Sequence, residues 1–252
     1  MTNSESCVII PIHKPKRVSE RVVIWEESKY MATSKTQANK SKCLNAAAKL
    51  FLAKGYTEST VRDIADEAGI NLSAMIRACG SKEDILCELV AYVLEGQFKS
   101  IEQMLCGITD DKILFYAAET TLQLYMAESS EHIREMYSVS YSLPKTSSII
   151  YHAITHKLEN IFKEHLPDLE TKDFYEYEIA SAGIMRNFMT VPCDMYFTME
   201  RKVARFLETT FLVYRVPDEK ISEAIEFVSK FDYPTIAQNV ISNMLAYLES
   251  QT

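Results

Sequence analysis

Basic side chains are concentrated in one short stretch of the chain. Residues 32–82 carry 8 basic and 4 acidic side chains, whereas residues 83–252 carry 14 and 27, in a chain of 252 residues with net charge −8. A local excess of positive charge favours contact with a polyanion such as nucleic acid. A chance fluctuation on a solvated surface is the alternative that charge alone leaves open.

The sequence gives weaker indications of a metal site or a catalytic site than of contact with nucleic acid. His152 and His156 stand four residues apart on an expected helix, with Glu159 one turn on, and this spacing could hold a metal ion. Surface or pocket histidines are the simpler interpretation. The chain has no GxGxxG, GxxxxGK[ST] or GxSxG string, and no nucleophile, base and orienting group can be assembled from it. We therefore expect no enzymatic activity, no cofactor and no metal.

The spacing of the cysteines and the hydropathy of the chain indicate the cellular compartment of the protein. The six cysteines, at positions 7, 43, 79, 87, 106 and 193, form no CxxC pair, so free thiols in a reducing cytosol fit best. No apolar run approaches the ~18 residues of a membrane span. These features predict a cytoplasmic protein that has no contact with a membrane.

Helices must position these side chains, because glycine and proline are scarce. Only 6 glycines and 7 prolines occur, too few for the turns of a many-stranded β-fold. Cap signals predict four helices in the first part of the chain: 37–54 ending at Gly55, 60–68 with Thr60 and Asp63 as a capping box, 71–79 capped by Asn71, and 81–106. Longer helices are expected over about 110–127, 130–142, 144–165, 172–190, 195–214, 218–230 and 234–250, which gives an all-α fold.

The segment TVRDIADEAGINLSAMIRAC, residues 60–79, has the pattern of a helix-turn-helix. Two short amphipathic helices flank Gly69, and their packing would depend on Ile64, Ala65, Ala68, Ile70 and Met75. In this motif the second helix lies in the major groove of DNA while the first crosses the backbone.

The wider segment from CLNAAAKLFLAKGYTESTVRDIADEAGI through GSKEDIL resembles the DNA-binding domain of the TetR/AcrR family of bacterial regulators. The resemblance covers about residues 39–88, and its matching positions are Ala46, Ala47, Leu50, Phe51, Gly55, Tyr56, Thr60, Val61, Ile64, Ala65, Ala68, Gly69, Ser81, Lys82 and Glu83. It implies a homodimer that binds palindromic operator DNA and represses transcription until a small molecule shifts the spacing of its recognition helices.

The resemblance also implies which residues meet DNA. Asn71, Ser73 and Arg77 would reach bases or phosphates from the recognition helix, and Thr60 and Lys82 would bind phosphates. The full set of expected DNA contacts is Lys40, Lys42, Thr60, Asn71, Leu72, Ser73, Ile76, Arg77 and Lys82.

The recognition helix departs from the family pattern at several positions. It has Leu72, Ser73, Ala74, Ile76 and Cys79, so two phosphate-binding hydroxyls of the family are lost. Leu72 and Ile76 could contact thymine methyl groups, or they could pack against the protein and leave DNA binding weak or absent. The second case would make the chain a helical ligand- or protein-binding module of the same fold.

Aromatic and methionine side chains between residues 113 and 199 could line a pocket for an apolar or aromatic inducer. Ordinary core packing is the alternative for each of them. The candidates are Phe115, Tyr116, Tyr125, Met126, Tyr137, Tyr141, Tyr151, Met185, Phe188 and Met189.

The sequence predicts three regions. Residues 1–31 would be a disordered arm or the product of an upstream start site, or else a β-hairpin or partner-binding tail. Residues 32–82 would bind DNA, and residues 83–252 would bind ligand and dimerise. Apolar stripes over 218–250 suit a dimer interface, with packing inside one chain as the alternative; they comprise Ile221, Ile225, Val228, Phe231, Ile236, Val240, Met244, Leu245 and Leu248.

Overall fold

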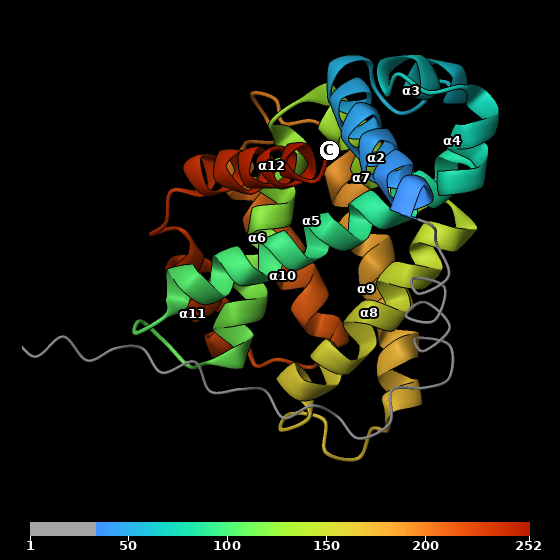
Figure 1. Cartoon of the computed structure of the whole chain (residues 1–252). Helices are drawn as coiled ribbons and strands as arrows, with labels where there is room; N and C mark the ends of the chain where they lie inside the picture. Colours follow the sequence, from blue (N-terminus) through green and yellow to red (C-terminus); the bar gives the residue numbers. More distant parts are fainter. Residues whose placement is uncertain (1–33) are drawn as a thin grey trace, which may run out of the picture.

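The computed structural model describes residues 34–252, and all regular structure within that range is α-helical (Figure 1). The expectations for residues 1–31 lie outside the described residues. The helices are α2 Ser34–Lys54, α3 Val61–Glu67, α4 Leu72–Cys79, α5 Lys82–Leu105, α6 Lys112–Glu128, α7 Glu131–Ser140, α8 Pro144–Phe162, α9 Thr171–Thr190, α10 Met199–Val213, α11 Asp218–Val228 and α12 Tyr233–Ser250. The predicted all-α class is confirmed.

Local cap chemistry sets the ends of the N-terminal helices as the sequence predicts. The Asp63 N–H donates to Thr60 Oγ1 at 3.1 Å, and the Thr60 N–H donates to Asp63 Oδ2 at 2.8 Å. Asn71 Oδ1 accepts from the Ala74 N–H at 2.8 Å, and Ser81 and Asp84 form a second capping box. These side chains satisfy backbone donors that the first turn of a helix leaves unpaired.

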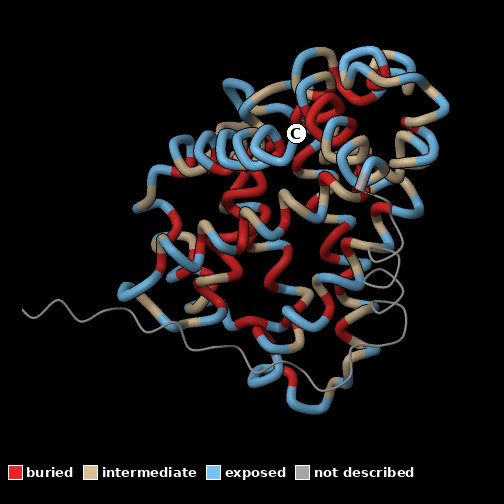
Figure 2. Tube along the Cα trace, in the orientation of Figure 1, coloured by how far each residue is buried: buried red, intermediate tan, exposed pale blue. Residues whose placement is uncertain are grey.

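Two hydrophobic cores divide the chain, and α5 contributes to both. The first lies among α2, α3, α4 and the start of α5, around Phe51, Ile64 and Met75, all fully buried. The second lies among α6 and α8–α12 together with the end of α5. Figure 2 shows buried segments along the inward sides of the helices in both parts. The N-terminal helices are thus seated on the body through a helix that belongs to both cores.

The stripe that predicted a dimer interface over 218–250 packs inside the chain. Val228, Val240 and Leu248 are buried, and Ile225, Phe231 and Met244 are half-buried against the two cores. The alternative of packing within one chain is therefore what the structure shows for these side chains. No helix in residues 34–252 is long and apolar enough to cross a membrane.

Candidate nucleic-acid interface and ligand cavity

The recognition helix α4 is anchored by one face and open on the other. Met75 is fully buried in the N-terminal core, whereas Asn71, Ser73 and Arg77 are exposed. The turn that joins α3 and α4 is closed by the Ile70 N–H, which donates to the Ala65 carbonyl at 3.0 Å. The buried side of α4 is therefore fixed in the core, while its exposed side carries these three polar side chains.

The two unusual apolar residues of α4 have different surroundings. Leu72 is half-buried and packs against the N-terminal core. Ile76 is 51% exposed, beside Arg77 on the open face. The thymine-methyl alternative is therefore available to Ile76, and the packing alternative describes Leu72.

Two of the predicted phosphate contacts have partners within the protein. Lys40 Nζ lies 2.7 Å from Glu88 Oε1. Lys82 Nζ donates to the carbonyls of Tyr56 and Ser59, both at 2.9 Å, and lies 4.1 Å above the Tyr56 ring. Burial lowers the pKa of Lys82. Lys82 therefore holds the turn before α3, whether or not it also meets DNA.

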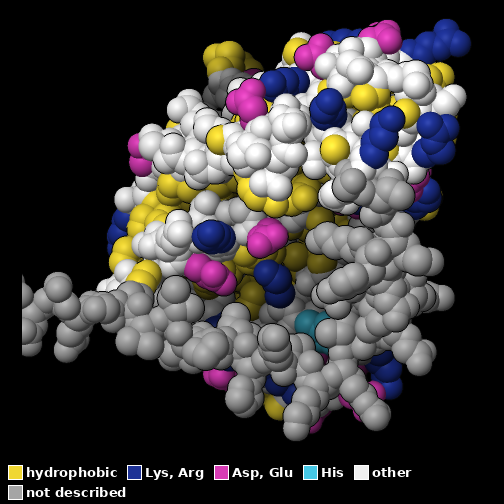
Figure 3. All heavy atoms as spheres, viewed as in Figure 1, with side chains coloured by type: hydrophobic (Ala, Val, Ile, Leu, Met, Phe, Trp, Pro, Cys, Tyr) yellow, Lys and Arg dark blue, Asp and Glu magenta, His cyan; other side chains and the backbone are white. Residues whose placement is uncertain are grey.

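Arg62 is a candidate that the sequence analysis missed. It is exposed in the first turn of α3 and forms no ion pair in the described structure. Lys42 of α2 and Arg77 of α4 are likewise exposed and without an ion pair there. Lys54, by contrast, is paired with Asp63 at 2.7 Å. Figure 3 shows Lys and Arg side chains distributed over this domain. The sequence does contain a signal for this role, because Arg62 follows the predicted N-cap residue Thr60 by only two positions.

Comparison with known proteins agrees with this geometry. Residues 44–89 match the family model of bacterial regulatory proteins, tetR family. These residues are therefore similar to the N-terminal domain of that family. It is 32% identical over 89 residues to the HTH-type transcriptional repressor KstR2 of Rhodococcus jostii (strain RHA1), an alignment that covers 35% of this chain and 44% of that protein. The chain thus matches less than half the length of this relative.

The fold similarity extends beyond the N-terminal domain. The crystal structure of RolR in complex with the ligand resorcinol aligns with a TM-score of 0.59 at 13% identity, over 78% of this chain and 96% of that one. At this level of identity the alignment concerns the fold. The helical body of the chain therefore shares its fold with a solved ligand-bound protein.

A small polar cavity, with about 30 Å³ of free space, lies among α5, α6, α8 and α9. Of the predicted pocket residues, the structure brings Phe115, Tyr116, Tyr141 and Met185 to its wall. Four polar residues of the wall, Glu119, Gln123, Lys157 and Glu178, were not predicted. The missed signal was the occurrence of Glu119 and Gln123 in the apolar sequence of α6.

The two carboxyl groups of this cavity are almost completely buried. Glu119 is 4% and Glu178 is 5% exposed. Gln123 Nε2 donates to Glu119 Oε1 at 2.8 Å, and Ser181 Oγ donates to Glu178 Oε2 at 2.9 Å. Burial raises the pKa of Glu119 to about 7 and that of Glu178 to about 8. Both groups are thus poised to exchange a proton near neutral pH.

A second cavity, with about 70 Å³ of free space, is almost entirely apolar and lies where the N-terminal domain meets the body. Met126, Tyr137 and Tyr141 line it together with Leu52 of α2 and Leu89 of α5. The remaining predicted pocket residues are not brought to either cavity. Tyr125 stacks on Tyr233, Tyr151 contacts Tyr175, Phe188 packs on Phe206, and Met189 is buried in the core.

Helix α7 connects the cavities to the N-terminal domain. Tyr141, at its C-terminal cap, donates from its hydroxyl to Gln123 Oε1 at 3.1 Å. Glu135, one and a half turns earlier, accepts from the N–H groups of Tyr56 and Thr57 at 3.1 and 2.8 Å. His132 Nδ1 lies 2.9 Å from the Leu52 carbonyl. Hydrogen bonds thus lead from Glu119 through α7 to the end of α2.

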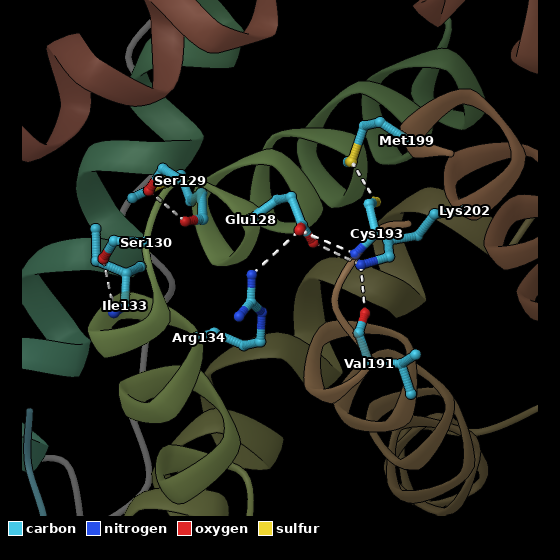
Figure 4. A network of polar contacts seen from close by, with 10 residues as sticks. Glu128, Ser129, Ser130, Ile133, Arg134, Val191, Cys193, Met199 and Lys202 are labelled. Carbon is cyan, nitrogen blue, oxygen red and sulfur yellow. Dashed lines mark hydrogen bonds and ion pairs between the residues drawn. The ribbon is translucent and has the colours of Figure 1, made fainter. Parts of the chain in front are cut away.

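A buried ion network fixes the loop between α9 and α10. Lys202, 1% exposed, donates to Glu128 Oε2 at 2.7 Å and to the Val191 carbonyl at 2.6 Å. Figure 4 shows Glu128 between Arg134 and this loop. Burial acts against its ionisation, but the hydrogen bonds from Lys202 and Cys193 hold the pKa of Glu128 below its ordinary value. The network orders the loop at the α9–α10 junction.

The metal candidates are not brought together with further ligands. His152 Nδ1 lies 2.7 Å from the Ser148 carbonyl, and His156 is 78% exposed, 3.7 Å from Glu159. Within residues 34–252, no cluster of three or more potential ligands could hold a metal ion. The surface interpretation therefore describes both histidines.

Proposed function

We propose that this chain is a ligand-responsive transcriptional regulator, most simply a cytoplasmic repressor, that binds palindromic operator DNA as a homodimer. The observation that carries the proposal is the open face of α4. Asn71, Ser73, Ile76 and Arg77 point outward from a helix whose inner face is fixed by Met75. Direct readout requires this combination, because a base-reading side chain must be held in register by the protein.

Dimerisation supports readout, because one short recognition helix reaches too few base pairs. We infer that the dimer face lies on the antiparallel pair α9 and α10. Ile179 of α9 is 45% exposed and Leu212 of α10 is 66% exposed. Near Ile179, a Cβ added at Gly183 would meet nothing within 4 Å. Small and apolar side chains of this kind allow a second helix pair to approach closely.

The effector would bind in the body, where the polar cavity lies at one end of the hydrogen-bond route through α7. KstR2 is named as a transcriptional repressor and the RolR structure contains resorcinol, which supports repression and ligand control here as proposals. One set of observations favours a second candidate, a module without specific DNA binding. Lys40, Leu72 and Lys82 are all engaged within the protein.

DNA binding by the wild type and by an Arg77→Ala variant distinguishes the operator-binding regulator from the module without specific DNA binding. We expect the wild type to bind DNA from the region beside its own gene, with affinity that falls steeply with salt. Loss of Arg77 should weaken binding by about 1–3 kcal/mol for each recognition helix. The measurement is fluorescence anisotropy at two salt concentrations, followed by footprinting.

Lys99→Ala is the matched control, because Lys99 is exposed in the second half of α5, outside α4 and the proposed dimer face, and forms no ion pair in the described structure. Equal binding by the two variants, or a wild type that binds every DNA fragment alike, would favour the module without specific DNA binding.

A further inference from the structure

In the cavity lined by Glu119 and Glu178, each of the two carboxyl groups has one oxygen atom without a hydrogen bond, whereas most of the other polar groups are paired. Tyr141 donates to Gln123, Gln123 donates to Glu119, and Thr120 donates to the Tyr116 carbonyl. Tyr214 donates to Ser181, which donates in turn to Glu178. Among the described residues, no hydrogen bond reaches Glu119 Oε2 or Glu178 Oε1. When these carboxyls are ionised, a ligand that enters the cavity is therefore met by oxygen atoms that require donors.

The charges of the wall are also unbalanced. Two carboxyl groups face the cavity, and Lys157 of α8 is the one cationic side chain among the described residues that line it. The Lys157 Nζ lies 3.1 Å from the centre of the Phe98 ring, so part of the charge of Lys157 is stabilised by this aromatic face. At most one carboxylate can be matched by Lys157, so ionisation of both leaves a buried negative charge that a cation would neutralise.

The rest of the wall suits an apolar or aromatic body. Phe98 of α5 and Phe115 and Tyr116 of α6 contribute aromatic rings to the wall. Ile154 and Leu158 of α8 and Met185 of α9 contribute aliphatic and thioether side chains. Aromatic faces also attract a cation within about 6 Å of the ring centre. The cavity thus combines apolar walls with acceptor oxygens of negative character.

We propose that this cavity widens by movement of its side chains to bind an organic ammonium ion with an aromatic or apolar body, held by hydrogen bonds to Glu119 and Glu178. The inference rests on the proposed function only for its regulatory meaning, that this ion is the effector; binding itself does not require DNA. It sharpens the earlier expectation of an apolar or aromatic inducer by adding a positive charge.

Binding should be linked to proton release, because a cation stabilises the ionised carboxyls. Glu119 faces Lys157 of α8, Glu178 of α9 and the hydroxyls of Tyr116, Tyr137 and Tyr141. Tyr116, Tyr141 and Tyr214 also lie within electrostatic range of Glu178, and Glu95 and Glu102 of α5 lie near Lys157. The pKa values of both carboxyls, about 7 and about 8, place this release near neutral pH.

The test uses three probes of the same size on the full chain without DNA: 2-phenylethylammonium, 2-phenylethanol and phenylacetate. Calorimetry should show that the ammonium ion binds about tenfold or more tightly than the alcohol, equivalent to ~1.4 kcal/mol, and that phenylacetate binds least. Affinity for the ammonium ion should rise between about pH 6 and pH 8, with proton release seen as a dependence of the heat on the buffer.

The variant Glu119→Gln/Glu178→Gln should lose the preference for the ammonium ion while it still binds the alcohol, which reports an intact cavity. Glu176→Gln is the matched control, because Glu176 is exposed on α9, two residues from Glu178. Absence of ammonium binding at millimolar concentration, equal binding of ammonium ion and alcohol, or an unchanged preference in the double variant would overturn the proposal. If the ammonium ion binds without any effect on the protein–DNA complex, this inference stands and the regulatory proposal fails.

Discussion

Gly55 lies at a close contact between the N-terminal domain and the body. It ends α2 with φ +84°, a conformation that glycine adopts without the clash of a Cβ atom. A Cβ built on Gly55 would lie 2.2 Å from Glu135 Oε2, the carboxylate that accepts from the next two backbone N–H groups. The absence of a side chain therefore serves both the helix end and the contact between domains.

Gly55→Ala should lower the free energy of unfolding by more than the backbone penalty alone. Left-handed backbone costs an L-residue about 1–2 kcal/mol, and displacement of Glu135 should add about 1–3 kcal/mol for donors left unpaired. Gly107→Ala is the matched control, since Gly107 has φ +74° and a Cβ there would meet nothing within 4 Å. Urea denaturation of both variants gives the difference; equal losses would mean that the Glu135 carboxylate moves aside freely.

At the scale of elements, the sequence predicts the helices and their ends better than their neighbours. Thr60 with Asp63, and Asn71, define helix starts through hydrogen bonds that span only three residues, so local sequence is sufficient to predict them. The stripe over 218–250 was read correctly as an apolar face. Its partner could not be predicted, because an apolar stripe buries itself equally well in its own chain or in a second copy.

The cavity shows the same limit. Tyr116 and Tyr125 look alike in sequence, yet one faces the cavity and the other stacks on Tyr233. The surroundings of these two tyrosines depend on the rotation of α6 relative to α8, α9 and α12. The local sequence does not determine this rotation. Glu119 was not among the predicted pocket residues, although its position on an otherwise apolar helix is a usable signal. A carboxyl at such a position is rarely buried without a functional or structural partner.

The outward faces of α9 and α10 give a prediction at this scale. If they form the dimer face, Leu212→Asp should convert a dimer at micromolar concentration into a monomer and abolish operator binding, because it places a charge in an apolar contact. Light scattering and DNA-binding assays measure the two effects. Ile108→Asp is the matched control, an equally large apolar residue that is 56% exposed outside these helices. A wild type that is monomeric, or a Leu212→Asp variant that remains dimeric, would place the interface elsewhere.

At the scale of the whole molecule, the two buried glutamates make stability depend on pH. Their pKa values in the folded chain, about 7 and about 8, lie above the ordinary value of 4.5. Below about pH 4.5 both are protonated whether the chain is folded or not. As the pH rises further, the unfolded chain releases these protons first, so the folded state loses stability until about pH 8. Carboxyls with a lowered pKa change the stability only at lower pH. The hydrogen bond from Lys54 lowers the pKa of Asp63 to about 2, so Asp63 is ionised throughout the range from about pH 4.5 to about pH 8.

The free energy of unfolding should therefore fall between about pH 5 and pH 8 in the wild type and vary less in Glu119→Gln/Glu178→Gln, because an amide cannot ionise. At about pH 8 the double variant should be the more stable protein by at least ~1 kcal/mol, since one unit of pKa shift corresponds to 1.36 kcal/mol. Chemical denaturation across the pH range measures this, with Glu176→Gln expected to follow the wild type. Parallel profiles for wild type and double variant would mean that both carboxyls ionise in the folded chain as they do in water, and that the cavity is already open enough to solvate them.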